Sequence, residues 1–169
     1  VGISSPVLFH SGRMLALDMP KGAEMLTCRL LAEDGFIYVE GLYTSSGKPV
    51  TSGIWDDSGK AYLFDEGMTV SSICMGGDGI CCVLNGTSSR RRGIIYRCGE
   101  KFQVPDGYAS IGSNPAMMID GIFHAGLSSL KGDGPMIWKD GTLEELDYNG
   151  YICSVTTNKD QASQETVLD

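Results

Sequence analysis

The chain has 169 residues, of which 42% are hydrophobic and 20% charged, and its formal net charge is −8. This length is about that of one ordinary domain, and the composition excludes a disordered or collagen-like chain. No apolar run approaches the roughly 18 residues that a membrane-spanning helix needs, and the negative charge disfavours a nucleic-acid partner. We therefore expect one globular domain over residues 1–169, with no membrane span and no nucleic-acid partner.

The N-terminal part of the chain, residues 6–33, predicts an incomplete group of strands. Phe9 is an aromatic residue followed by a turn at Gly12, and residues 13–18 predict a further strand. The same order of aromatic residue, glycine turn and apolar run recurs later, where it is preceded by one more strand. Residues 6–33 therefore correspond to a repeat unit that lacks its first strand.

Three complete units follow, and each begins with an Asp-Gly pair, at Asp34, Asp78 and Asp120. The Asp-Gly pair is followed by an apolar run, a Gly, a Ser-Ser loop with a basic residue, an aromatic residue, a Gly turn and a second apolar run. The starts lie 44 and 42 residues apart, and a period near forty is typical of a solenoid or a propeller. The predicted units are 34–77, 78–119 and 120–160, and residues 161–169 form a ring-closing strand or a tail.

The apolar runs of these units are short and rich in Ile, Val, Tyr and Phe, which favours strands over helices. In the unit that begins at Asp34, four antiparallel strands are predicted, at residues 36–42, 53–56, 61–65 and 69–75. We expect the repeated aromatic residues to pack between neighbouring sheets rather than to stack on a ligand. Those residues are Trp55, Tyr96 and Trp138.

The turn that follows each of these aromatic residues carries the resemblance to a known family. It has the form [WY]-x-x-G, as in Tyr96-Arg97-Cys98-Gly99 and Trp138-Lys139-Asp140-Gly141, with one extra residue in Trp55-Asp56-Asp57-Ser58-Gly59. These motifs resemble the repeats of uncharacterised bacterial β-propeller proteins, which have the form IYVAG…W-x-[ND]-G. The resemblance covers about residues 6–155; it implies a fold and no activity.

The expected fold is an all-β propeller of about four blade equivalents, each a four-stranded antiparallel sheet, with the first incomplete. The units account for about fifteen strands, and a ring of four such blades needs sixteen. One arrangement is a closed four-bladed ring to which residues 161–169 add the missing strand. The other is half of a larger ring, completed by a second copy in a homodimer, because a half-ring exposes two apolar blade faces.

The Ser-Ser loops, which we call the rim loops, carry the candidate ligand-binding residues. They are TSSGKP, TSSRRRG and LSSLKGD, at residues 44–49, 87–93 and 127–133, and in an antiparallel blade all of them emerge on one rim. One interpretation is a set of solvated hairpin tips, and the other is a basic surface for an anionic ligand. The basic residues are Lys48, Arg90, Arg91, Arg92 and Lys131.

Three residues occupy one position in the first strand of each unit, namely Tyr38, Cys82 and His124. If these strands line the axis of a propeller, their side chains approach one another there. A thiol beside an imidazole suggests nucleophilic catalysis or a metal site. No HExxH, GxSxG or Cys-x-x-Cys motif accompanies them, so packing in the core is the alternative interpretation.

The six cysteines lack the spacing of a disulfide scaffold or a zinc site, and several stand among apolar residues. We expect buried free thiols, with no metal and no cofactor. The cysteines are Cys28, Cys74, Cys81, Cys82, Cys98 and Cys153.

The sequence therefore predicts a binding or scaffold module that recognises a glycan or a protein through its rim loops. A bacterial protein outside the cytoplasm, secreted, periplasmic or at the cell surface, fits this interpretation. The competing hypothesis is a hydrolase or lyase that acts at the axial opening with Cys82 and His124. A third is a purely structural repeat that forms a larger ring by association of chains.

Overall fold

The computed structural model of the protein describes residues 5–33, 35–76, 79–88, 92–112 and 115–156. These residues form an all-β structure in which strands account for 59% and helices are absent. No helix in this part of the chain is long and apolar enough to cross a membrane. The all-β class expected from the sequence is confirmed.

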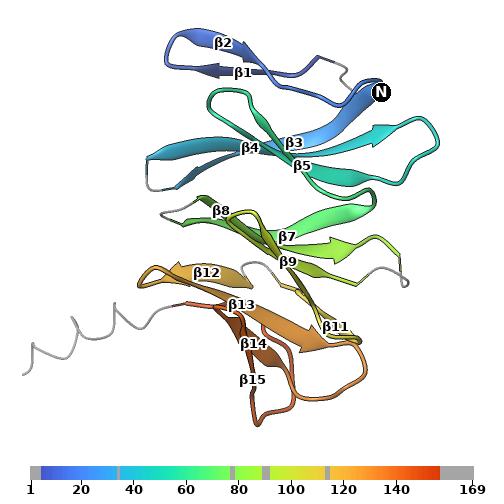
Figure 1. The fold of residues 1–169 in the computed structure, drawn as a ribbon, viewed down its shortest axis with the longest axis vertical. Coiled ribbons are helices and arrows are strands. Elements are labelled where there is room, and N and C mark those ends of the chain that lie inside the picture. The colour runs from blue at the N-terminus through green and yellow to red at the C-terminus, as the bar shows by residue number, and fades with distance from the viewer. Residues whose placement is uncertain (1–4, 34, 77–78, 89–91, 113–114, 157–169) are drawn as a thin grey trace, which may run out of the picture. The chain divides into compact units, whose positions relative to one another are not determined.

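Most strands belong to three antiparallel sheets, in each of which consecutive strands of the chain lie side by side (Figure 1). We call them the first, second and third meanders. The first contains β3 (Ala23–Glu33), β4 (Phe36–Ser45), β5 (Thr51–Asp56) and β6 (Ala61–Leu63), and the second contains β7 (Met68–Gly76), β8 (Gly79–Gly86), β9 (Ile94–Arg97) and β10 (Glu100–Gln103). The third contains β12 (Ala116–Ile119), β13 (Ile122–Ser129), β14 (Met136–Lys139) and β15 (Thr142–Glu145).

The third meander has an additional strand, and the chain begins with a separate hairpin. β11 (Tyr108–Ala109) pairs with the end of β13, where Tyr108 lies opposite Ser129. The hairpin consists of β1 (Val7–His10) and β2 (Arg13–Ala16). It contains the Phe9 strand and the Arg13 strand that the sequence predicts for the incomplete first unit.

The grouping of strands into sheets differs by one strand from the expected one. We expected the strand that begins at Phe36 to be the first strand of its sheet, with the strand before it in a different sheet. In the structure that strand, β4, pairs with β3 on one side and with β5 on the other. The reason is that an Asp-Gly pair favours a two-residue hairpin turn. At Asp120 and Gly121 both residues have positive φ, 49° and 78°, as a type I′ turn requires. This turn joins β12 to β13 within one sheet instead of separating two sheets.

The last predicted unit also differs from the expected pattern. Its first three strands form as β13, β14 and β15, but after β15 only an isolated bridge at Ser154 is present in the described residues. The backbone N–H of Ile152 donates a hydrogen bond of 3.0 Å to the Ser128 hydroxyl. This segment therefore packs against β13 without continuing the pattern of the meander.

The chain divides into two compact units, each with its own core. One comprises the described residues of Val1–Val70 and Leu84–Ile94, and the other those of Ser71–Val83 and Ile95–Asp169. Trp55 is buried in the core of the first unit, and Trp138 is buried in the core of the second, where it packs on Phe102 and Phe123. Burial of these two tryptophans confirms that they are packing residues.

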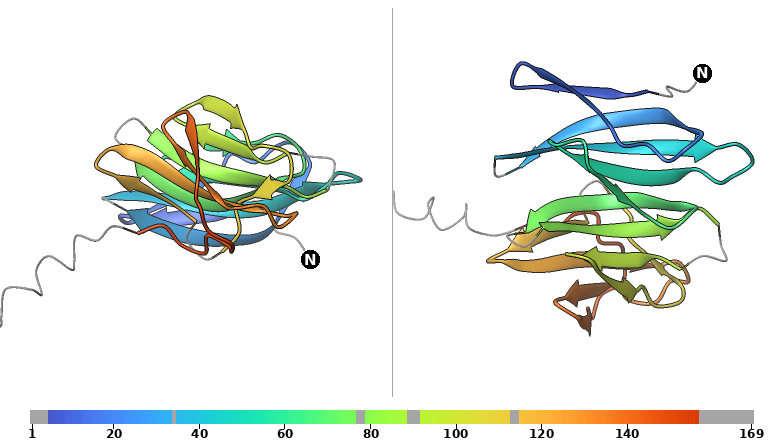
Figure 2. Two further views of the ribbon diagram at one scale, coloured as in Figure 1. Left: turned by 90° about the horizontal axis from the view of Figure 1, so that it is seen from below. Right: turned by 45° about the horizontal axis from the view of Figure 1, so that its top comes forward.

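The β1–β2 hairpin forms a separate layer beside the first meander (Figure 2). Leu8 is buried in the core of the first unit, together with Met25 and Val39. The opposite face of the hairpin carries Phe9 and Met14, which pair across the strands and are 72% and 71% exposed. One face of the hairpin thus joins the core, and the other is apolar and uncovered in the described structure.

Candidate functional site

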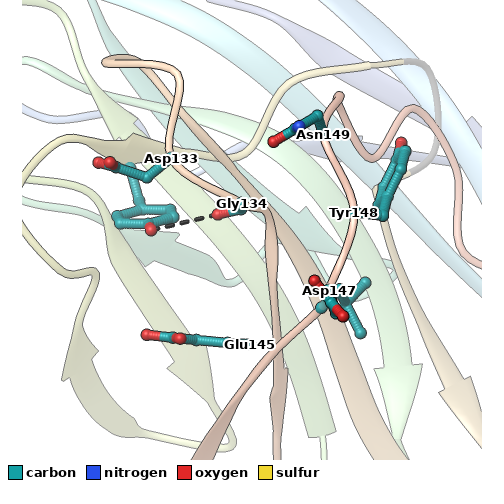
Figure 3. A pocket seen from close by; sticks show the side chains of 8 residues that line it. Asp133, Gly134, Glu145, Asp147, Tyr148 and Asn149 are labelled. Atoms are coloured by element: carbon teal, nitrogen blue, oxygen red, sulfur yellow. Dashed lines mark hydrogen bonds between the residues drawn. The ribbon is translucent and has the colours of Figure 1, made fainter.

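A cavity of about 660 Å³ opens beside the third meander, where the connection between β13 and β14 meets the segment that follows β15. Asp133 is the last residue of the rim loop, Gly134 follows it, and Glu145 is the last residue of β15. Figure 3 shows the side chains of Asp133 and Glu145 on one side of the cavity and that of Tyr148 on the other. The complete lining consists of Tyr108, Asp133, Gly134, Glu145, Leu146, Asp147, Tyr148 and Asn149.

The rim loop that carries Asp133 is held by a buried serine. The hydroxyl of Ser129 accepts hydrogen bonds of 3.1 Å from the backbone N–H groups of Lys131 and Asp133. Serine favours such turns because its hydroxyl satisfies backbone donors that the strand ladder no longer pairs. Ser129 therefore shapes this loop, whereas the hydroxyl of Ser128 accepts a hydrogen bond from the backbone N–H of Ile152.

The opposite wall of the cavity is formed by the segment after β15, which lies close to the connection between β13 and β14. The backbone N–H of Leu146 donates a hydrogen bond of 2.9 Å to the Pro135 carbonyl oxygen. A Cβ atom at Gly134 would lie 3.0 Å from the Leu146 carbonyl oxygen, so the side chain missing from glycine permits this approach. The Tyr108 hydroxyl donates to the Gly134 carbonyl oxygen at 3.2 Å and so connects β11 to the wall that contains Gly134.

The electrostatic character of the cavity is acidic. Its lining contains the carboxylates of Asp133, Glu145 and Asp147, and none of the eight lining residues is Lys, Arg or His. Partial burial of the ring, followed by the charges of Asp133 and Glu145, raises the pKa of the Tyr108 hydroxyl above its ordinary value of 10.0. The cavity thus combines negative charge, hydrogen-bond acceptors and two aromatic rings.

A smaller cavity of about 140 Å³ occupies the corresponding connections of the first meander. Lys48 comes from the loop between β4 and β5, and Glu66 from the segment after β6. Their side chains form an ion pair with 3.2 Å between Nζ and Oε2. In the first meander a cation of the chain itself, from the rim loop, therefore pairs with the acidic residue of the segment after β6.

The predicted basic residues of the rim loops are only partly described. Lys48 and Lys131 lie in hairpin connections of the first and third meanders, as expected, and both are exposed. Arg92 is exposed just before β9, while Arg90 and Arg91 lie outside the described residues. Lys48 is paired with Glu66, which reduces the positive charge that it presents to an anionic ligand.

The column of Tyr38, Cys82 and His124 does not lie at a sheet edge. These residues are in β4, β8 and β13, and each of those strands has a neighbour on both sides. Our expectation that these strands form the inner edge of each sheet was therefore wrong, because the preceding strand pairs there. Tyr38 and Cys82 are buried.

The structure does not give Cys82 the access to solvent that the catalytic hypothesis requires, because its exposed fraction is 0%. The Nδ1 atom of His124 is 3.0 Å from the Ile122 carbonyl oxygen. A carbonyl oxygen only accepts, so Nδ1 is the protonated nitrogen in this bond. Within the described ranges, no group of three or more His, Cys, Asp or Glu side chains is arranged to hold a metal ion.

All six cysteines are thiols rather than members of disulfides, and three of them, Cys74, Cys81 and Cys82, are buried. The expectation of buried thiols therefore holds for half of the set. Cys81 and Cys98 lie close together, with 3.7 Å between their sulfur atoms. Sequence spacing did not reveal this pair because the two residues are brought together by the β8–β9 hairpin.

The acidic cavity was also missed by sequence reasoning, although its rim loop was identified. Tyr108 lies in β11, a strand of two residues that no pattern predicted. Asp133 follows the predicted Lys131 by two positions, and Glu145 and Asp147 stand in a conspicuously acidic stretch, EELDYNG. The sequence feature that could have indicated the cavity is this acidic stretch at the end of the last predicted strand.

Comparisons of the chain with protein-family models, with curated proteins and with solved structures gave no match.

Proposed function

We propose that the protein is a binding module, built from propeller-type sheets, whose acidic cavity in the third meander receives a cationic side chain of a partner protein. The observation that carries this proposal is the lining of that cavity. It has three carboxylates and two tyrosines but no cationic residue. A Lys or Arg side chain would pair with the carboxylates and lie against the aromatic rings, which attract cations.

The first meander supplies an internal comparison. There the ammonium group of Lys48 pairs with Glu66 across the same two connections. In the third meander those connections contribute Asp133 and Asp147 to the cavity, and Lys131 of the same rim loop is not among its lining residues. The carboxylates of this cavity therefore leave a place for a partner's cation, whereas Glu66 pairs with the chain's own Lys48.

The size of the cavity favours a protein segment over a single ion. A volume of about 660 Å³ lies within the range of roughly 300 to 1,000 Å³ that is usual for ligand sites. A lysine side chain fills only part of it, which leaves room for neighbouring residues of a peptide. The propeller arrangement of the meanders is part of the same proposal, supported by their common strand order.

The test is a titration of the full chain with N-acetyl-lysine amide and N-acetyl-arginine amide, followed by NMR. We expect shifts at Tyr108, Tyr148 and Asn149 that weaken with added salt, because the attraction is between charges. The uncharged analogue N-acetyl-norleucine amide is the control ligand, and it should cause no comparable shifts. Equal shifts with all three ligands would overturn the proposal.

A matched pair of variants locates the site. The double variant Asp133→Asn with Glu145→Gln should weaken binding about tenfold or more, since two carboxylates are neutralised. Glu66→Gln, in the cavity of the first meander, should leave it unchanged. If the acidic cavity instead bound a neutral oligosaccharide equally well in both variants, the ligand would be a glycan and the cationic partner would be ruled out.

A second candidate function, association of chains, is favoured by the outer face of the β1–β2 hairpin. Phe9 and Met14 on this face are mostly exposed, and such a face is buried when two copies pair through it. Sedimentation velocity over a range of concentrations should show a dimer that the double variant Phe9→Ser with Met14→Ser abolishes. A monomer at all concentrations, or a dimer unaffected by these changes, would exclude this interface.

A further inference from the structure

Cys81 and Cys98 form a close pair of thiols in the second meander. Cys81 lies in β8 and is buried, while Cys98 lies in the turn between β9 and β10 and is exposed. Their sulfur atoms are 3.7 Å apart. The backbone N–H of Cys98 donates a hydrogen bond of 3.0 Å to the Ile80 carbonyl oxygen, which fixes the turn beside β8.

The positions of the two side chains suit a covalent bond between their sulfurs. The hydrogen bond from the Cys98 N–H to the Ile80 carbonyl oxygen places the backbone of Cys98 beside β8, next to the residue that precedes Cys81. A bonded pair of sulfurs is about 2.05 Å apart. The two sulfurs therefore need to approach by less than 2 Å, roughly the change that a side-chain rotation provides.

The two thiols differ in their access to reagents. Cys98 is exposed at the turn, so a small oxidant reaches it directly. Burial, followed by the hydrogen bond and charge of Cys98, raises the pKa of the Cys81 thiol to about 12. Cys81 is therefore unreactive toward external reagents and lies in contact with the sulfur of Cys98.

We propose that Cys98 and Cys81 are an oxidation site at which a low-molecular-weight disulfide converts the two thiols into an intramolecular disulfide while the protein stays folded. The Cys98 thiolate attacks one sulfur of the reagent, forms a mixed disulfide and releases one thiolate, which takes up a proton. Cys81 then loses its proton and attacks the Cys98 sulfur, and the second reagent thiol leaves. Two protein thiols are oxidised and one reagent disulfide is reduced to two thiols.

The bond would close a loop that contains residues 87–93, the arginine-bearing rim loop. Cys81 precedes this loop in β8, and Cys98 follows it after β9. The oxidation site is therefore placed to tether the two strands from which the rim loop extends. This inference is independent of the ligand proposed for the third meander.

The experiment treats the native full chain with oxidised glutathione, alkylates the remaining thiols and maps the peptides by mass spectrometry. We expect a product lighter than the reduced protein by two hydrogen atoms, with Cys81 linked to Cys98. Its formation from the mixed disulfide should accelerate by about tenfold for each pH unit between pH 7 and 9, because the Cys81 thiolate is the attacking group. A Cys98 linkage to Cys28 or Cys153, or a disulfide that forms only in urea, would overturn the proposal.

Variants separate the two steps. Cys81→Ala should stop at a stable glutathione adduct on Cys98, and Cys98→Asn, which suits the positive φ of 47° at this turn, should leave Cys81 unmodified. Cys28→Ser and Cys153→Ser change exposed cysteines outside the pair and should leave closure unaffected. Rapid loss of the glutathione adduct in folded Cys81→Ala would show that another thiol resolves it and would contradict the role of Cys81.

Discussion

The indole Nε1 of Trp55 donates a hydrogen bond of 2.9 Å to the carbonyl oxygen of Asp18. This bond joins the centre of the first meander to the segment that follows the β1–β2 hairpin. The backbone N–H of Asp18 donates in turn to the Gly59 carbonyl oxygen at 3.1 Å. The N-terminal hairpin is thus attached to the first meander by polar bonds as well as by its buried leucines.

Replacement of Trp55 by Phe should lower the free energy of unfolding by about 1 to 3 kcal/mol, because the Asp18 carbonyl loses its partner and a smaller ring fills the site. Urea unfolding followed by circular dichroism measures the change. Tyr62→Phe is the control, since its partly exposed hydroxyl is 3.4 Å from Asp56 Oδ2, and its cost should be clearly smaller. Equal costs for the two variants would contradict the importance of the Asp18 bond.

Gly59→Ala should destabilise the first unit by more than Gly47→Ala. Both residues have positive φ, 84° and 75°, so each substitution incurs backbone strain of about 1 kcal/mol. At Gly59 the added Cβ would also lie 2.6 Å from the Ala16 carbonyl oxygen, whereas at Gly47 no atom lies within 4 Å. Thermal unfolding of the two variants tests this order. A reversed order would show that the backbone of β2 moves aside for the added methyl group at little cost in free energy.

Ser129→Ala should loosen the rim loop of the third meander, since two backbone donors lose their acceptor, at a cost of about 1 to 3 kcal/mol. Hydrogen exchange of the Lys131 and Asp133 amides should accelerate. The control is Thr142→Ala, which removes an exposed hydroxyl bond to the Lys139 carbonyl oxygen and should leave those two amides unaffected. Unchanged exchange in Ser129→Ala would mean that the loop is held by other contacts.

Tyr108 should ionise at a higher pH than an ordinary tyrosine, because partial burial and the charges of Asp133 and Glu145 disfavour the phenolate. The folded-state pKa exceeds the unfolded value of 10.0. The contribution of the protonated Tyr108 hydroxyl to the free energy of unfolding is therefore fully present below pH 10 and is lost as the pH rises through the folded-state pKa. NMR titration of Tyr108 measures this pKa, and Asp133→Asn should lower it. A pKa that Asp133→Asn leaves unchanged would argue against the acidic character of the cavity.

The four strands predicted for the unit that begins at Asp34 show how much a local sequence pattern can predict. Residues 36–42, 53–56, 61–65 and 69–75 were predicted as strands, and each prediction overlaps an observed one, β4 to β7. Alternation of apolar residues and the glycine turns encode such segments locally. The grouping was wrong because the Asp-Gly pair was interpreted as a boundary, although it is also a strong hairpin signal.

The sites required contacts that no local pattern contains. Cys81 meets Cys98 only because β8 and β9 pair, and the acidic cavity exists only because Tyr108, Asp133 and Glu145 come from three separate segments. The sequence by itself determined the all-β class, the strand segments and the turns, since these depend on residues near one another in the chain. The tertiary structure alone decided which strands share a sheet and which carboxylates share a cavity, because burial and charge depend on neighbours that are distant along the chain.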